Sequence, residues 1–196
     1  MLAQELLEQP KMSNHARGLW GYTGKSAAGD ELTIQSTGMG GPSASIVLAD
    51  LAELGVRRAI RIGTCASLGE RDLGELVVVS EAQASQAAFA SSEATKAPRP
   101  DMELTAALRD RLPEARLGVA LSLDSLYRPE RNLPSTLAEV ADMQTASLLA
   151  TAAQVDLALA VLLIVSEKSE AGQLRDEDLA EAAKRAGQTA VSILSP

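Results

Sequence analysis

The chain has 196 residues, of which 46% are hydrophobic, 22% are charged and only 2% are aromatic. This length and composition suit a single globular domain over residues 1–196, with a core of aliphatic side chains. The formal net charge of -8 argues against nucleic-acid binding, although a small local anion site remains compatible with it. One cysteine, Cys65, and one histidine, His15, exclude an internal disulfide and a histidine-rich metal centre.

The sequence carries no sign of a membrane or export segment. The longest apolar run, over residues 157–165, is too short to cross a bilayer. No basic stretch followed by an apolar one begins the chain, so no signal peptide is expected. We therefore expect a cytoplasmic protein without a membrane partner.

Helices and strands are predicted to alternate along the first part of the chain. In order, we expect a helix over 2–7, a polar turn over 13–18, a hairpin or loop over 21–30 and a strand over 32–36. A glycine-rich turn over 38–43 leads into an amphipathic helix over 43–54, which Gly55 ends. A short buried strand over 59–62, a loop over 63–69 and a strand over 76–79 follow.

The second part of the chain continues the alternation after a stretch of weak pattern over 81–100. We expect a helix over 102–111, a strand over 117–121, a long helix over 138–153 and a continuous apolar strand over 157–165. A closing helix over 176–194 has Asp176 placed as its cap. The alternation predicts an α/β fold with a mixed, mostly parallel sheet flanked by helices.

The glycine-rich turn Gly38-Met39-Gly40-Gly41-Pro42-Ser43 stands between a predicted strand and a predicted helix. Glycines let a ligand approach the backbone closely, and the helix start presents free N–H groups. The run matches neither the dinucleotide-binding G-x-G-x-x-G nor a phosphate-binding P-loop. By itself it is as compatible with a purely structural turn as with a ligand site.

Arg61 lies at the end of a predicted apolar strand, beside Gly63 and Thr64. Burying a lone arginine is costly without a partner, and its guanidinium suits a phosphate or a carboxylate. Arg61 and the Thr64 hydroxyl are therefore candidates for an anion site. The alternative is an internal salt bridge between Arg61 and a neighbouring carboxylate.

Several short motifs stand in a fixed order between Arg17 and Ser195. They are residues 16–24 (ARGLWGYTG), 36–46 (STGMGGPSASI), 54–57 (LGVR), 61–65 (RIGTC), 74–78 (GELVV), 124–127 (DSLY), 141–146 (ADMQTA) and 165–167 (VSE). Taken together, they resemble the uridine and purine nucleoside phosphorylase family.

The resemblance implies cleavage of the N-glycosidic bond of a nucleoside, with phosphate as co-substrate and no other cofactor or metal. The products would be a free base and a pentose 1-phosphate. It implies that Arg61 and Thr64 hold phosphate. It also implies that Arg17 reaches the phosphate of a neighbouring subunit's site, so that a homodimer or a higher homo-oligomer is needed.

The resemblance also implies roles on the nucleoside side. Met143 and Gln144 would face the ribose, and Gln144 and Glu167 would take the catalytic positions, with Glu167 protonating the base. The residues implied for the base pocket are Leu126, Tyr127 and Arg131.

The sequence differs from the family pattern in several places. Nothing before Lys11 matches the family's first strand and its Gly-Asp-Pro phosphate loop, so we expect the fold with its first strand missing. Gln144 stands where the family has Glu, Leu126 where it has an aromatic residue, and Glu167 where the purine enzymes have Asp. These differences predict reduced activity or a changed substrate. The alternative is a non-catalytic base- or nucleoside-binding relative, or an accessory subunit.

Overall fold

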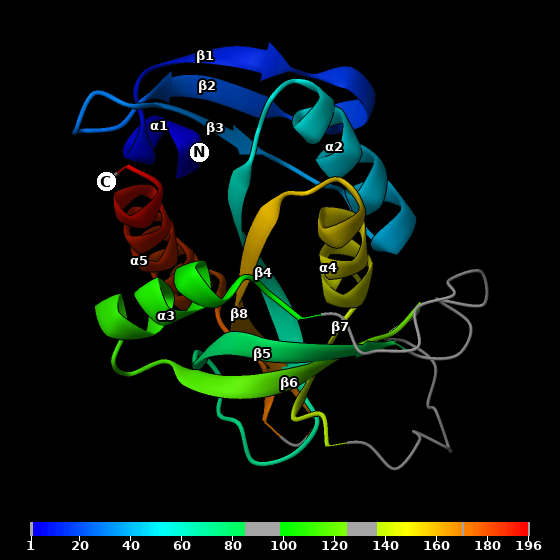
Figure 1. Cartoon of the computed structure of the whole chain (residues 1–196). Helices are drawn as coiled ribbons and strands as arrows, with labels where there is room; N and C mark the ends of the chain where they lie inside the picture. Colours follow the sequence, from blue (N-terminus) through cyan, green and yellow to red (C-terminus); the bar gives the residue numbers. More distant parts are fainter. Residues whose placement is uncertain (1, 85–98, 125–136, 170, 196) are drawn as a thin grey trace.

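The computed structural model describes residues 2–84, 99–124, 137–169 and 171–195 (Figure 1). The helices are α1 (Leu2–Leu6), α2 (Gly41–Glu53), α3 (Met102–Arg111), α4 (Thr145–Gln154) and α5 (Asp176–Leu194), with a short 3-10 helix at Ala16–Gly18. No helix in these ranges is long and apolar enough to span a bilayer.

The strands form two sheets. The small antiparallel sheet consists of β1 (Glu8–Asn14), β2 (Gly21–Lys25) and β3 (Glu31–Gln35). The large sheet contains β4 (Arg58–Ser67), β5 (Leu76–Ala84), β6 (Arg116–Ser122), β7 (Val140–Asp142), β8 (Ala158–Lys168) and β9 (Gly172–Gln173).

The large sheet has the order β4-β7-β6-β5-β8-β9, and a further pairing of β4 with β8 closes five of these strands into a ring. The pairs β4–β8, β5–β6 and β6–β7 are parallel, whereas β4–β7, β5–β8 and β8–β9 are antiparallel. The predicted single-domain α/β fold with a mixed sheet between helices is thus confirmed, and three of the six pairings described in this sheet are parallel.

The core lies on both sides of the large sheet. Helices α2 and α4 cover one side through Leu48 and Leu149, and α3 and α5 cover the other through Leu108 and Ala186 (Figure 1). Strand β8 is buried from Leu159 to Val165, which confirms its prediction as a strand covered on both faces. The small sheet lies above these layers, next to α1 and α2 (Figure 1).

Four local predictions were wrong. Ser13 and Asn14, expected in a polar turn, end strand β1 (residues 8–14), because the backbone of this segment pairs with β2. Strand β4 continues to Ser67, where a loop over 63–69 was expected, because its backbone stays paired with β8. Residues 138–153 are divided into the buried strand β7 and helix α4. Helix α5 is capped at Arg175, without a side-chain hydrogen bond, instead of by Asp176.

Candidate functional site

The glycine-rich turn brings the N-terminal ends of α2 and α4 together. Gly38 and Gly40 have φ values of 73° and 80°, a left-handed conformation that favours glycine. A Cβ on Gly41 would lie 2.2 Å from Oγ of Ser147, so the missing side chain allows α4 to approach. Gly40 caps α2 without a side-chain hydrogen bond, and the helix therefore begins with open N–H groups.

Arg61 is the fourth residue of β4 and lies inside the strand, not at its end as expected. Its guanidinium covers Gly63, where a Cβ would lie 2.6 Å from Nη1 and 2.8 Å from Nη2. The side chain is only 10% exposed, and Nη2 lies 2.9 Å from Oδ2 of Asp142. The internal salt bridge that the sequence left open as an alternative is therefore present.

Asp142 is the carboxylate at the centre of this network, and the sequence did not single it out. Its side chain is 1% exposed and accepts hydrogen bonds from Oγ of Ser122 at 2.7 Å and from Oγ1 of Thr145 at 2.7 Å. It also accepts from the Thr145 N–H, and the N–H of Ala146 donates to Oγ of Ser122. Asp142 thus provides negative charge at the start of α4, where the helix dipole favours it. A short Asp side chain just before a helix commonly accepts hydrogen bonds from nearby backbone N–H groups, which is the sequence signal for this role.

The electrostatics of the site follow from its burial. Burial lowers the pKa of Arg61, and the Asp142 carboxylate opposes this shift. Burial, with a further contribution from Asp142, raises the pKa of the Cys65 thiol to about 12. Cys65 is therefore a buried, protonated thiol that donates to the carbonyl of Ile164 and is not poised as a nucleophile.

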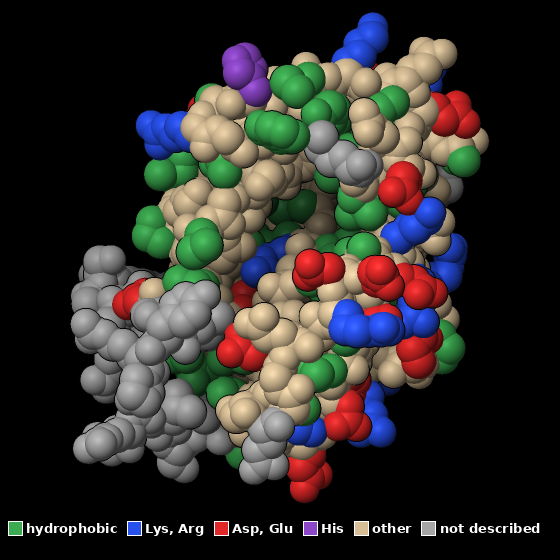
Figure 2. Space-filling view, turned by 180° about the vertical axis from the view of Figure 1, so that it is seen from behind, with side chains coloured by type: hydrophobic (Ala, Val, Ile, Leu, Met, Phe, Trp, Pro, Cys, Tyr) green, Lys and Arg blue, Asp and Glu red, His purple; other side chains and the backbone are tan. Residues whose placement is uncertain are grey.

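Two N–H groups of Arg61 have no bonded acceptor among the described residues. A guanidinium has five N–H donors. Nη2 donates to Asp142 and to Gln144, and Nη1 donates to Thr145 at 3.4 Å. Within the described part of the chain, no acceptor is bonded to the Nε–H or to the second Nη1–H. Figure 2 shows that the molecule is hollowed between its upper and lower parts, with a basic side chain beside the hollow.

The structure does not bring Thr64 and Glu167 to Arg61. Side chains alternate along a strand, so Thr64 lies on the side of Ile62, and it is exposed. Glu167 is exposed near the end of β8, where it pairs with Ala66 of β4. Ala66 is five residues beyond Arg61, which corresponds to about 16 Å along the strand.

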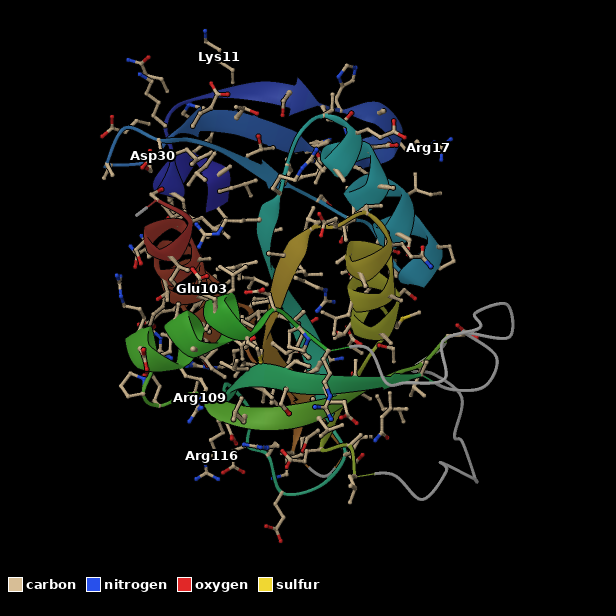
Figure 3. The ribbon with its side chains drawn as sticks, viewed as in Figure 1. Lys11, Arg17, Asp30, Glu103, Arg109 and Arg116 are labelled. Carbon is tan, nitrogen blue, oxygen red and sulfur yellow. The ribbon has the colours of Figure 1, made fainter. Side chains whose placement is uncertain are left out.

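The other expected site residues lie in different surroundings. Met143 is half-buried between β7 and α4, next to the buried Gln144. Arg17 is exposed in the 3-10 helix, with a left-handed φ of 56°. It points away from the body of the molecule near α2 (Figure 3). The residues expected in the base pocket, Leu126, Tyr127 and Arg131, lie outside the described residues.

Comparisons with known proteins agree on one family. The sequence profile of the phosphorylase superfamily matches residues 1–195. The chain is 31% identical, over 85% of its length and 76% of the relative's, to a DeoD-type purine nucleoside phosphorylase of Alkaliphilus metalliredigens. It is 29% identical, over 98% of its length and 89% of the relative's, to DeoD-type purine nucleoside phosphorylase 1 of Shewanella oneidensis.

The fold agrees with this assignment. A crystal structure of purine nucleoside phosphorylase from Toxoplasma gondii in complex with immucillin-H superimposes with a TM-score of 0.85. The match covers 99% of this chain and 86% of the other, at 22% sequence identity. The chain belongs to the phosphorylase superfamily and is a member of its nucleoside phosphorylase family.

Proposed function

We propose that this protein cleaves the N-glycosidic bond of a purine nucleoside with phosphate, giving the free base and a pentose 1-phosphate. The observation that carries the proposal is Arg61, a buried guanidinium with two free N–H groups close to the open start of α2. Such an arrangement suits an oxyanion. The choice of a purine rests on the relatives, which are named purine nucleoside phosphorylases.

The roles of the remaining residues belong to the same proposal. Bond cleavage builds positive charge on the ribose, which an anion held at Arg61 would stabilise. Met143 is proposed to contact the ribose. Thr64 lies on the other side of β4 from Arg61, so it is not proposed to share the phosphate held there. The leaving base needs a proton or a strong hydrogen bond, for which Glu167 is the proposed donor. Leu126, Tyr127 and Arg131 remain the proposed base contacts, and a cytoplasmic location remains a prediction.

We also propose that the protein acts as a homo-oligomer in which Arg17 reaches a neighbouring copy's site. Arg17 forms no hydrogen bond or ion pair with any described residue and holds an unfavourable left-handed conformation. Two large apolar side chains, Met39 and Ile46, are exposed at 79% and 55% on the turn and on α2. An interface over this surface would cover the apolar side chains and bring Arg17 to a second chain.

The second candidate is a non-catalytic relative that binds a base or nucleoside, or serves as an accessory subunit. It is favoured by the internal pairing of Arg61, whose charge Asp142 already balances. It is also favoured by Gln144, which brings no charge to a position where the family has a carboxylate.

One assay separates the two candidates. The purified protein is incubated with inosine, guanosine, adenosine and uridine, with and without phosphate, and released base is measured. The first candidate requires base release that depends on phosphate, whereas no release at high protein concentration contradicts it. Release without phosphate indicates hydrolysis, which contradicts the phosphorylase reaction.

A pair of variants on one strand tests the role of Arg61. Arg61→Lys keeps the charge but loses the planar donor arrangement, so we expect a KM for phosphate raised at least about tenfold. Arg58→Lys is the control, because Arg58 is exposed and lies 3.7 Å from Glu103 at the surface. Equal KM values for the two variants would remove Arg61 from the phosphate site.

A further inference from the structure

The amide of Gln144 is fully occupied by the protein itself. Its Nε2 donates to the carbonyl of Gly38 at 2.7 Å and to that of Gly40 at 3.5 Å. Its Oε1 accepts from Oγ1 of Thr37 at 3.3 Å and from Nη2 of Arg61 at 3.2 Å. A side-chain amide has two N–H donors and two acceptor lone pairs, so these contacts use its whole capacity.

The orientation of this amide follows from its partners. Turning it by 180° would point N–H groups at the Arg61 guanidinium and the amide oxygen at two carbonyls. Gln144 is only 7% exposed, so water cannot readily replace a lost partner. A ribose hydroxyl would therefore have to break an internal hydrogen bond in order to bind here.

We propose that Gln144 is a positioning residue, whose amide clamps the glycine-rich turn at 37–40 to the Arg61 guanidinium, and that it does not bind the ribose. Gln144 caps α4, so its contacts with the turn and with β4 join three elements at one point. The residues joined are far apart in sequence, since Thr37 and Gln144 are separated by 107 positions along the chain. This assignment rests on the proposed function only in the experiment that uses substrate; the exchange experiment does not depend on it.

The geometry requires an amide and not a carboxylate. An ionised Glu at position 144 can only accept hydrogen bonds. It can still accept from Thr37 and Arg61, but its other oxygen would face the Gly38 and Gly40 carbonyl oxygens and repel them. A protonated Glu has one O–H donor and restores one bond to the turn. Gln144→Glu is therefore expected to loosen the turn when ionised and to recover part of the clamp when protonated.

The charged and titratable groups around position 144 decide how readily a Glu at this position ionises. From β4, Arg61 favours the ionised form, whereas the Cys65 thiol is protonated and contributes no charge. From β7, the Asp142 carboxylate opposes ionisation, as do burial and the two carbonyls of the turn.

The primary test is amide hydrogen exchange of the segment 40–48, in which the Ala44 N–H donates to the Gly40 carbonyl of the turn, measured without substrate at about pH 8 and about pH 5. Each variant is compared with the wild type at the same pH. Gln144→Met removes every bond of the clamp, and we expect its exchange to be at least about tenfold faster at both pH values. Gln144→Glu is expected to exchange faster at about pH 8 and closer to the wild type at about pH 5. Gln154→Glu and Gln154→Met are the controls, because Gln154 is exposed at the other end of α4, and they should leave this segment unchanged.

Two results would overturn the proposal. Wild-type exchange in Gln144→Met shows that no clamp exists, and equal acceleration of Gln144→Glu at both pH values shows that donation to the carbonyls is irrelevant. If Gln144→Met does not fold, Thr37→Val removes one bond only and should still accelerate exchange, whereas unchanged exchange in Thr37→Val contradicts the clamp.

A substrate experiment separates positioning from ribose binding. The ratio of kcat/KM for inosine to that for its 2′- and 3′-deoxy analogues is measured in the wild type and in Gln144→Met. A positioning role predicts an unchanged ratio together with a raised KM for phosphate, because Arg61 is less well held. A ratio that collapses at least about tenfold shows that Gln144 holds a ribose hydroxyl, which overturns the proposal. An inactive wild type with a loosened turn in Gln144→Met leaves the clamp standing and contradicts the proposed function alone.

Discussion

Replacing Asp142 with Asn should destabilise the protein strongly, although the two side chains have nearly the same shape. Asp142 is 1% exposed and Arg61 10% exposed, so Asp142→Asn leaves a guanidinium in the interior without its counter-charge. Breaking a buried ion pair by removing one partner typically costs about 3–5 kcal/mol. Ser122 and Thr145 donate to different oxygens of Asp142, so the single amide oxygen of Asn can keep only one of these two hydrogen bonds. The lost bond therefore adds to the effect of the lost charge.

The measurement is the free energy of unfolding by urea for the wild type and for a double-mutant cycle. The cycle combines Asp142→Asn with Arg61→Met, and the double variant should lose at least about 1 kcal/mol less than the sum of the single variants. Glu103→Gln is the control, because it removes an exposed ion pair. Glu103 is 86% exposed and lies 3.7 Å from Arg58, which is on β4 like Arg61. We expect its loss to be about 0–1 kcal/mol. A loss in Asp142→Asn no larger than that of Glu103→Gln would refute the reasoning.

Two further predictions concern the core and the buried thiol. Gly118→Ala would place a Cβ 2.7 Å from Cγ1 of the fully buried Val77, so we expect a loss of about 1–3 kcal/mol in urea unfolding; Gly69→Ala meets nothing within 4 Å and should be close to neutral. The folded pKa of Cys65, about 12, lies above the value of about 8.5 for a free thiol, so the unfolded chain loses its proton first and rising pH favours unfolding. The stability of the wild type relative to Cys65→Ala should therefore fall between about pH 8 and about pH 10, and a constant difference in unfolding free energy would contradict this.

The local hydrophobic pattern of the sequence was sufficient to predict the helices that pack through an amphipathic face. Helices α3 and α5 have the bounds that their periodicity predicts, and α2 begins two residues earlier and ends one residue earlier than predicted. Strand β1 was missed because polar, mostly exposed side chains carry no strand pattern, and its stability comes from pairing with β2. Strand β7 was missed because three buried residues ahead of an Ala- and Leu-rich helix look like the first turn of that helix.

The site was predictable in its residue types but not in its contacts. The cost of burying Arg61 correctly indicated a partner, yet local sequence cannot choose between a phosphate and a carboxylate that lies 81 positions away at Asp142. The same limit applies to Thr64, which is close to Arg61 in sequence but on the other side of the strand. Contacts across the fold decide both questions, and only the structure contains them.

The network around Arg61 connects the departure at position 144 to the chemistry that the family resemblance implies. Arg61 and Asp142 balance each other, and Gln144 adds no charge, so an arriving phosphate meets a neutral group of side chains with free N–H donors. A carboxylate at position 144 would make this group negative and oppose the anion, but it would also favour the positive charge that develops on the ribose. A family carboxylate that bonds the ribose contributes one charged hydrogen bond, and its absence here corresponds to about 1.5–3 kcal/mol, or roughly 10- to 150-fold in rate. Gln144 should therefore favour phosphate binding over the rate of bond cleavage, so that the wild type combines a low KM for phosphate with a low kcat.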